Sequence, residues 1–282
     1  MILHFSTLAP AYDVLLCDVW GVVHNGVMAF PHACDALMRA RAGGAKVILI
    51  TNAPRPSAVV ARQLEKLHVP RETYDAIVSS GDVTRGVIEQ RPGQSLFHLG
   101  PERDRSIFTG LNVDFAPLES ADYVVCSGLE DDDMETPEDY RARLETMRAR
   151  KLFMLCGNPD VVVERGDKLV YCAGSIADLY AGMGGEVLYA GKPYRPIYDM
   201  ALAKAEAAAG AKIATSRVLA VGDSVRTDLT GARTIGVDFL FVTSGIHAEE
   251  LGTRERPESA ALTAKFAAAG KMPKAVMRQL TW

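Results

Sequence analysis

The stretch Leu15–Gly26, LLCDVWGVVHNG, decides how the rest of the chain is interpreted. The apolar run Val14–Cys17 has the length and composition of a buried strand, and Gly21 marks a turn after it. Parallel α/β sheets present reactive groups at the carboxyl ends of such strands. The pattern therefore makes Asp18 a candidate nucleophile, although a lone Asp in this place is more often a helix or turn cap.

The composition is that of a globular protein. The chain has 282 residues, of which 48% are hydrophobic and 23% charged, so disordered and fibrous classes are excluded. The net charge of -4 gives no electrostatic reason to expect nucleic acid or an acidic membrane as a partner. Because no apolar run reaches membrane-spanning length and residues 1–6 lack signal-peptide features, we expect a cytoplasmic protein.

The cysteines and histidines do not form a metal-binding pattern. The five cysteines are scattered, with no C-x-x-C pair, and the six histidines form no H-E-x-x-H motif. We therefore expect reduced core cysteines and no zinc site.

The first eighty residues alternate between strand and helix patterns. Strands are predicted at Val14–Cys17, Lys46–Thr51 and Ala76–Ser80, and helices at Pro31–Ala42 and from the proline-rich loop after Thr51 to about Leu67. This β-α-β-α-β order with short connections predicts a parallel sheet with helices on its faces.

The middle of the chain continues the alternation with shorter strands. Thr136 and Asp139 have the spacing of a capping box and predict a helix start. The acidic run Glu130–Asp133 lacks a calcium-loop pattern and is interpreted as a solvated loop. The strands predicted here are 96–99, 123–126 and 152–155.

The last hundred residues return to strong alternation. The glycine-rich segment Gly182–Gly185 lacks the third glycine of a dinucleotide fingerprint and is interpreted as a helix-ending turn. Strands are predicted at 218–221 and 238–242, and helices at 196–209, 229–234 and 273–280.

Four distant segments each end a strand or enter a turn with a polar residue suited to phosphate or Mg²⁺. These are Asp18, Thr51-Asn52, Gly191–Pro193 and Gly222–Asp228. The carboxyl ends of parallel strands form one crevice, so we expect these segments to converge. Each segment alone has an ordinary structural explanation as a turn or cap, but the ordered set is far more specific.

Each of these residues has a function in phosphoryl transfer. Asp18 can attack phosphorus and form an aspartyl-phosphate. Mg²⁺ prefers oxygen ligands, which the Asp18 and Asp223 carboxylates and the backbone carbonyl of Trp20 can supply, with Asp228 completing the set. Thr51 can donate its hydroxyl and backbone N–H to phosphate oxygens, and Lys192 adds a positive charge.

The ordered motifs resemble those of a known family. DVWGVVHNG (18–26), ITNAPRPS (50–57), GKP (191–193) and VGDSVRTDLTGA (221–232) look like motifs one to four of the haloacid dehalogenase superfamily of hydrolases. The insertion between motifs two and three resembles the class IIA cap of NagD-like sugar and nucleotide phosphatases. The resemblance implies a Rossmann-like α/β core with a parallel sheet at residues 1–82 and 187–282, and an inserted α/β cap at 83–186.

The resemblance also implies roles for particular residues. Asn158 and Asp160 belong to an N-P-D segment that faces the active site in related caps, so they are candidate substrate contacts; the alternative is a loop that simply turns at Pro159. Arg55 either reaches an anionic substrate or is merely solvated. A homodimer is also expected from the class IIA resemblance. The matched motifs make Asp18 the nucleophile, Lys192 the motif-three lysine, Thr51 and Asn52 phosphate binders, and Asp223 and Asp228 the metal pair.

The sequence departs from the family pattern at Trp20. Phosphatases of this superfamily usually carry an Asp here that protonates the leaving group, whereas indole offers only an N–H donor. Losing a general acid–base typically costs about 10²–10⁴-fold in rate. His24 is an alternative acid and base, but a histidine in such a turn is more often structural.

Two functions are therefore open at this stage. The first is a Mg²⁺-dependent phosphatase acting on a small phosphorylated metabolite, such as a sugar phosphate or nucleotide, through an aspartyl-phosphate. The alternative is a slow or non-catalytic protein that binds a phosphorylated metabolite, because Trp20 replaces the acid. Cap side chains rather than core motifs select the substrate in either case.

Overall fold

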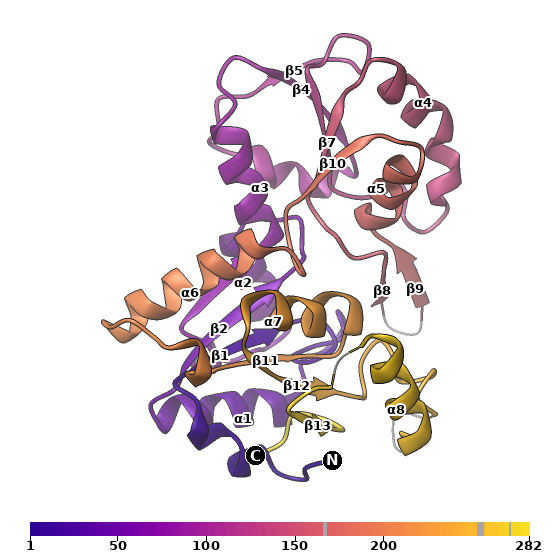
Figure 1. Cartoon of the computed structure of the whole chain (residues 1–282). Coiled ribbons are helices and arrows are strands. Elements are labelled where there is room, and N and C mark those ends of the chain that lie inside the picture. The colour runs from indigo at the N-terminus through magenta and orange to yellow at the C-terminus, as the bar shows by residue number, and fades with distance from the viewer. Residues whose placement is uncertain (166–167, 253–256, 271) are drawn as a thin grey trace.

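The computed structural model describes residues 1–165, 168–252, 257–270 and 272–282. The chain forms two lobes, each built around its own parallel sheet, and both termini lie on the lobe that contains β1 (Figure 1). In the described part of the chain, no helix has the length and apolar character needed to cross a membrane.

The larger lobe contains a six-stranded sheet in the order β13-β12-β11-β1-β2-β3, with all neighbouring strands parallel. All five residues of β1 are buried, because this strand lies between β11 and β2 and both of its faces are covered. The bounds are β1 Val14–Asp18, β2 Lys46–Thr51, β3 Ala76–Ser79, β11 Val218–Gly222, β12 Asp238–Val242 and β13 Ala275–Met277.

Helices cover both faces of this sheet, and alternate residues of β1 belong to different clusters. Leu15 packs in a core with residues of α1 and α2, whereas Leu16 packs in a core with residues of α6, α7 and α8. The bounds are α1 Pro31–Ala42, α2 Ser57–Lys66, α3 Ser80–Glu89, α6 Arg195–Ala209, α7 Thr230–Ile235 and α8 Ser259–Ala268.

The smaller lobe contains a five-stranded parallel sheet in the order β10-β7-β6-β4-β5. Its core includes buried residues of α4 and α5, among them Leu144 and Ile176. The predicted return to the first lobe at residue 187 falls inside β10. The bounds are β4 Ser95–Leu99, β5 Asp114–Phe115, β6 Tyr123–Cys126, β7 Phe153–Cys156, β10 Glu186–Tyr189, α4 Arg141–Ala149 and α5 Ala173–Gly182.

An antiparallel hairpin, β8 (Val162–Arg165) with β9 (Lys168–Tyr171), extends from the smaller lobe toward the larger one (Figure 1). Short helices complete the described structure. They are η1 Phe5–Thr7, η2 Ala9–Ala11, η3 Arg71–Thr73, η4 Glu102–Phe108, η5 Pro137–Tyr140, η6 Thr215–Arg217 and the π-helical η7 Val225–Leu229.

Three predictions about local structure were confirmed. Thr136 and Asp139 form the predicted capping box at the start of η5, and α5 ends at Gly182 in the predicted glycine turn. The five cysteines are buried thiols.

The helix predicted at Pro273–Leu280 was wrong. Ala275–Met277 is instead an edge strand that pairs in parallel with β12, and the preceding alanine-rich segment forms α8. Pairing with β12 satisfies the backbone of this short segment better than an isolated helical turn can, because short helices are marginal without packing. Its Met277 and Leu280 side chains are buried.

We expect Leu49→Ala to lower the free energy of unfolding by about 2–5 kcal/mol, because Leu49 lies fully buried on β2 and the change leaves a cavity. Urea denaturation followed by circular dichroism measures this change. Leu3→Ala is the matched control: Leu3 is 79% exposed, so its effect should stay within about 0.5 kcal/mol. Equal losses in the two variants would contradict this assignment of the core.

Candidate active site

The four sequence segments meet above the carboxyl ends of β1, β2 and β11, as predicted. Asp18 ends β1, Thr51 ends β2, and Asp223 follows the last residue of β11. Lys192 comes from the connection between β10 and α6, and Asp228 lies in η7. All five side chains are buried, although they are polar or charged. Such burial requires mutual pairing or a bound ion.

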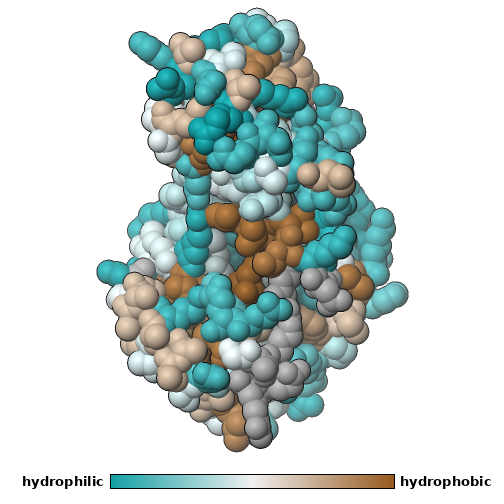
Figure 2. Space-filling view, turned by 90° about the vertical axis from the view of Figure 1, so that its right-hand side faces the viewer, coloured by the Kyte–Doolittle hydropathy of each residue, from teal (hydrophilic) through white to brown (hydrophobic). Residues whose placement is uncertain are grey.

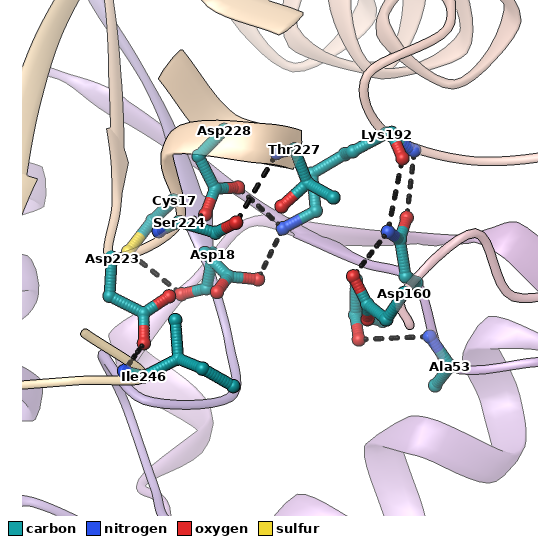
Figure 3. A network of polar contacts seen from close by, with 12 residues as sticks. Cys17, Asp18, Ala53, Asp160, Lys192, Asp223, Ser224, Thr227, Asp228 and Ile246 are labelled. Carbon is teal, nitrogen blue, oxygen red and sulfur yellow. Dashed lines mark hydrogen bonds and ion pairs between the residues drawn. The ribbon is translucent and has the colours of Figure 1, made fainter. Parts of the chain in front are cut away.

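Lys192 lies among the carboxylates (Figure 3). Its Nζ donates to Asp18 Oδ1 at 2.5 Å and to Asp228 Oδ1 at 2.6 Å. Asp18, Asp223 and Asp228 each place a carboxylate oxygen within 4.8 Å of the other two. One ammonium group therefore faces three carboxylates.

This excess of negative charge shifts the pKa values of the residues in the cluster. Burial, reinforced by the Asp228 carboxylate, raises the pKa of Asp18 well above its usual range. The same two causes raise the pKa of Asp223 to about 7. Burial alone would lower the pKa of Lys192, but Asp18 and Asp228 together raise it well above the ordinary value, so this lysine stays charged. A divalent cation would relieve the repulsion among the carboxylates.

The cluster fits Mg²⁺ in its donor set and in its close packing. All of its candidate ligands are oxygens, which Mg²⁺ prefers. The backbone closes tightly around Asp223: a Cβ added at Gly21 or at Gly245 would come within 2.1 Å or 1.9 Å of Asp223 Oδ2, so glycine is required there. The Ile246 N–H donates to the same oxygen at 2.8 Å and orients the carboxylate.

Asn52 positions other groups at the site. Its Oδ1 accepts a hydrogen bond from the Lys192 backbone N–H at 2.7 Å. Its Nδ2 donates to the Lys192 carbonyl at 3.1 Å and to Asp160 Oδ1 at 2.9 Å, which engages both amide hydrogens. The Asn52 side chain thus fixes Lys192 against the sheet. Thr51 Oγ1 accepts a hydrogen bond from the Ala53 N–H at 3.2 Å, and Thr51 lines a cavity beside Asp18.

A cavity of about 140 Å³ opens at this cluster. Its walls include Arg226, which belongs to the predicted Gly222–Asp228 segment. They also include residues that the sequence did not single out: Ile246 and His247 from the loop after β12, and Val161–Val163 from the start of the hairpin. The position of Ile246 and His247 just after a predicted buried strand was the available signal. The hairpin residues had no such signal, because they approach from the other lobe.

A second cavity, of about 100 Å³, lies on the side of the smaller lobe. Arg55 does not simply project into solvent: its Nε lies 3.5 Å from Asp104 Oδ1 across the two lobes. Asp132, from the acidic run predicted to be solvated, is mostly buried and binds both Arg103 and Arg165. Burial raises the pKa of Asp104 to about 6, although Arg55 opposes the shift.

The N-P-D segment lies at the junction of the two cavities. Asp160 borders both cavities, and Asn158 borders the second. Asn158 Oδ1 accepts a hydrogen bond from the Asp160 N–H at 3.0 Å, which closes the turn at Pro159. The segment therefore forms a tight turn and also faces the site, so the two alternatives drawn from the sequence do not exclude each other.

Trp20 borders both cavities, and His24 packs against it edge to face with ring centroids 5.0 Å apart. His24 is 2% exposed, and its Nδ1 accepts a hydrogen bond from the Gly26 N–H at 2.9 Å. Burial lowers the pKa of His24 to about 4. These contacts favour a structural role for His24 over the role of acid and base.

Comparison with known proteins identifies the family. Models described as haloacid dehalogenase-like hydrolase and as HAD-hydrolase-like match residues 15–114 and 189–269. A solved hydrolase of the haloacid dehalogenase-like family from Brucella suis 1330 is 43% identical, with a TM-score of 0.90 and complete coverage of both chains. The chain belongs to the haloacid dehalogenase-like hydrolases. This confirms the predicted superfamily and α/β fold class.

More distant relatives of this hydrolase carry phosphatase names. An acid sugar phosphatase of Staphylococcus aureus (strain USA300) is 25% identical over 241 residues, which are 85% of this chain and 89% of the relative. The structure of a p-nitrophenyl phosphatase from Archaeoglobus fulgidus shares the fold at 22% identity, with a TM-score of 0.73 and coverage of 96% and 97% of the two chains.

We expect Mg²⁺ to stabilise the protein increasingly as pH rises. The pKa of Asp223 in the folded protein, about 7, exceeds that of an unfolded Asp, about 3.9. In the metal-free protein, the stability that Asp223 contributes is therefore lost as pH rises from about 4 through 7. Mg²⁺ offsets this loss, by about 2.7 kcal/mol when its concentration is 100 times its dissociation constant.

Thermal unfolding at pH 5.5 and pH 8, with and without Mg²⁺, measures the effect. Asp223→Asn should reduce it strongly, whereas Asp133→Asn, at a side chain that is 63% exposed, is the matched control and should not. A Mg²⁺ effect that survives in Asp223→Asn would place the ion elsewhere.

We expect His24→Asn to leave the shape of the pH–rate profile between pH 5 and 8 unchanged, because a ring with a pKa of about 4 stays neutral throughout this range. Asn can still accept the Gly26 N–H. The neutral ring contributes stability that is present above about pH 6.5 and is lost as pH falls toward 4. Loss of one limb of the wild-type profile in this variant would instead assign proton transfer to His24.

Proposed function

We propose that this hydrolase is a Mg²⁺-dependent phosphatase that acts on a small phosphorylated metabolite through an aspartyl-phosphate on Asp18. One observation carries the proposal: the Asp18 carboxylate ends a buried strand beside the Lys192 ammonium and the buried carboxylates of Asp223 and Asp228. Relatives named acid sugar phosphatase support a phosphate ester as substrate.

Four residues act in the first step of the proposed reaction. Asp18 attacks phosphorus, while Lys192 and the Thr51 hydroxyl bind the phosphate oxygens and Asn52 holds Lys192 in place. Mg²⁺, when bound by Asp18, Asp223, Asp228 and the Trp20 carbonyl, supplies positive charge that offsets the repulsion between the nucleophile and the phosphate. In the second step water attacks phosphorus and Asp18 returns as a carboxylate.

The remaining expectations extend this proposal. Residues 1–82 and 187–282 act as the catalytic core, and residues 83–186 as a class IIA cap that selects the substrate, with Asn158 and Asp160 among its contacts. We also propose a cytoplasmic homodimer. The alternative of a non-catalytic binding protein is less well supported, because Lys192, Asp18, Asp223 and Asp228 lie together and the relatives are named as phosphatases.

We expect Asp18→Asn to abolish phosphate release, by more than about 10³-fold, because the amide cannot form the covalent intermediate. Phosphate release from a panel of sugar phosphates, nucleotides and p-nitrophenyl phosphate with Mg²⁺ measures this. Asp13→Asn is the matched control at an exposed acid on the same lobe. Failure of the wild type to release phosphate from any member of the panel would favour the binding-protein alternative.

A further inference from the structure

The two cavities have four lining residues in common. Trp20, Thr51, Asp160 and Val163 border both the cavity at Asp18 and the cavity of the smaller lobe. A phosphate ester whose phosphorus reaches Asp18 and whose remaining atoms enter the second cavity must pass between these side chains. In that pose the leaving group of the proposed reaction would lie against Trp20.

The indole of Trp20 has a fixed position. His24, itself buried, packs against the ring at an interplanar angle of 69°. Gly26 packs closely on the ring near Cζ2 and Cη2: a Cβ added there would lie 2.5 Å from Trp20 Cζ2, and the φ of +87° also favours glycine. A ring held in this way keeps its position when a ligand binds. Little conformational entropy is therefore lost in ordering the ring on binding.

The hairpin region contributes valines to both cavities and the charged Arg165 to the second. Val161, Val162 and Val163 line the first cavity, and Val163 and Val170 line the second. Figure 2 shows apolar residues gathered at the waist between the lobes, on the side where the β8–β9 hairpin lies in Figure 1. An apolar cavity of about 150 Å³ accepts a benzene ring, so the first cavity, of about 140 Å³, is large enough for a single ring. The second cavity, of about 100 Å³, also has charged walls, which include Arg55, Asp104 and Asp132.

The chemistry of Trp20 points to the same class of leaving group. Indole cannot give a proton to the departing oxygen near neutral pH. An oxygen that leaves without a proton must be a stable anion. A phenol-type oxygen, with a pKa of about 10, meets this condition far better than an alcohol, whose pKa lies near that of water at about 16.

We infer that Trp20 determines leaving-group specificity, and that the substrates are aryl or heteroaryl phosphate monoesters whose ring stacks on the indole and departs as an aryloxide. This inference rests on the proposed function and narrows it. The Asp18 oxygen forms a bond to phosphorus, and the phosphorus–oxygen bond to the ring breaks. The electron pair leaves with the ring oxygen, and no proton is transferred in this step.

The competing source of a proton is Asp160, a carboxylate that borders both cavities. Burial raises the pKa of Asp160, whereas Lys192 and the hydrogen bond that Oδ1 accepts from Asn52 favour the ionised form. The experiment must therefore separate a reaction without an acid from one in which Asp160 is the acid.

The first test uses single-turnover phosphorylation of Asp18 by substituted phenyl phosphates, with glycerol 3-phosphate and glucose 6-phosphate as alkyl substrates. Without an acid, the logarithm of the rate falls steeply as the pKa of the phenol rises, and the alkyl esters react about 10²–10⁴-fold more slowly. A flat dependence that becomes steep in Asp160→Asn would overturn the inference and assign the acid to Asp160.

The second test uses variants of Trp20. Trp20→Ala should raise KM for aryl phosphates about tenfold and leave KM for glycerol 3-phosphate within about twofold, whereas Trp20→Phe should retain most of the aryl preference. Trp20→Asp should speed the alkyl esters by about 10²-fold or more and flatten the leaving-group dependence. If Trp20→Ala and Trp20→Phe both lose activity equally on aryl and alkyl phosphates, Trp20 has only a structural role.

A binding measurement tests the stacking on Trp20 without requiring turnover. Trp20 and Trp282 are the only tryptophans, and Trp282 packs on Phe5 at the terminus. In the Asp18→Asn, Trp282→Phe protein, p-nitrophenyl phosphate should quench the remaining fluorescence after correction for its absorbance, and glucose 6-phosphate should not. Saturable binding of p-nitrophenyl phosphate without quenching would refute stacking. Quenching in a protein whose wild type releases no phosphate would refute the proposed function alone.

Discussion

The interaction on which the site depends is the burial of three carboxylates around one ammonium group. Charges of this kind are costly to remove from water, and each is tolerable only while its partners are present. Lys192 satisfies Asp18 and Asp228 at once, and the backbone at Ile246 satisfies Asp223. The excess negative charge that remains makes the cluster suited to a cation. Stability and function are therefore in opposition at these residues.

The parallel sheet is what makes this arrangement possible. Neighbouring strands β11, β1 and β2 end at the same edge, so Asp223, Asp18 and Thr51 converge without any local contact in the sequence. The register beside β1 places Asp18 next to Ile50, one residue before Thr51. The Asn52 side-chain amide hydrogen-bonds to both the backbone N–H and the carbonyl of Lys192, which lies 140 residues further along the chain. The rigid scaffold supplies the order that a loop alone would lack.

Sequence patterns predicted the strands and helices whose bounds depend on neighbouring residues in the chain. The apolar strand Lys46–Thr51 and the helix Pro31–Ala42 were predicted with their observed bounds, because the apolar pattern and the flanking proline and glycine residues indicate where they begin and end. The edge strand Ala275–Met277 was missed because its strand character comes from pairing with β12. The hairpin and the pairing of Asp132 with Arg103 and Arg165 were missed for the same reason: they exist only in the tertiary structure.

Trp20 shows how one substitution can change both the chemistry and the shape of a site. An Asp at this position would be small and able to exchange a proton, whereas the indole is large, fixed and unable to do so. The surrounding chain is adapted to the larger group, since Gly26 leaves room for the ring near Cζ2 and the His24 ring packs against it. These contacts indicate that the indole is an integrated part of the fold rather than a tolerated defect. A site that has lost its acid and gained a flat apolar wall is suited to esters that need the wall and not the proton.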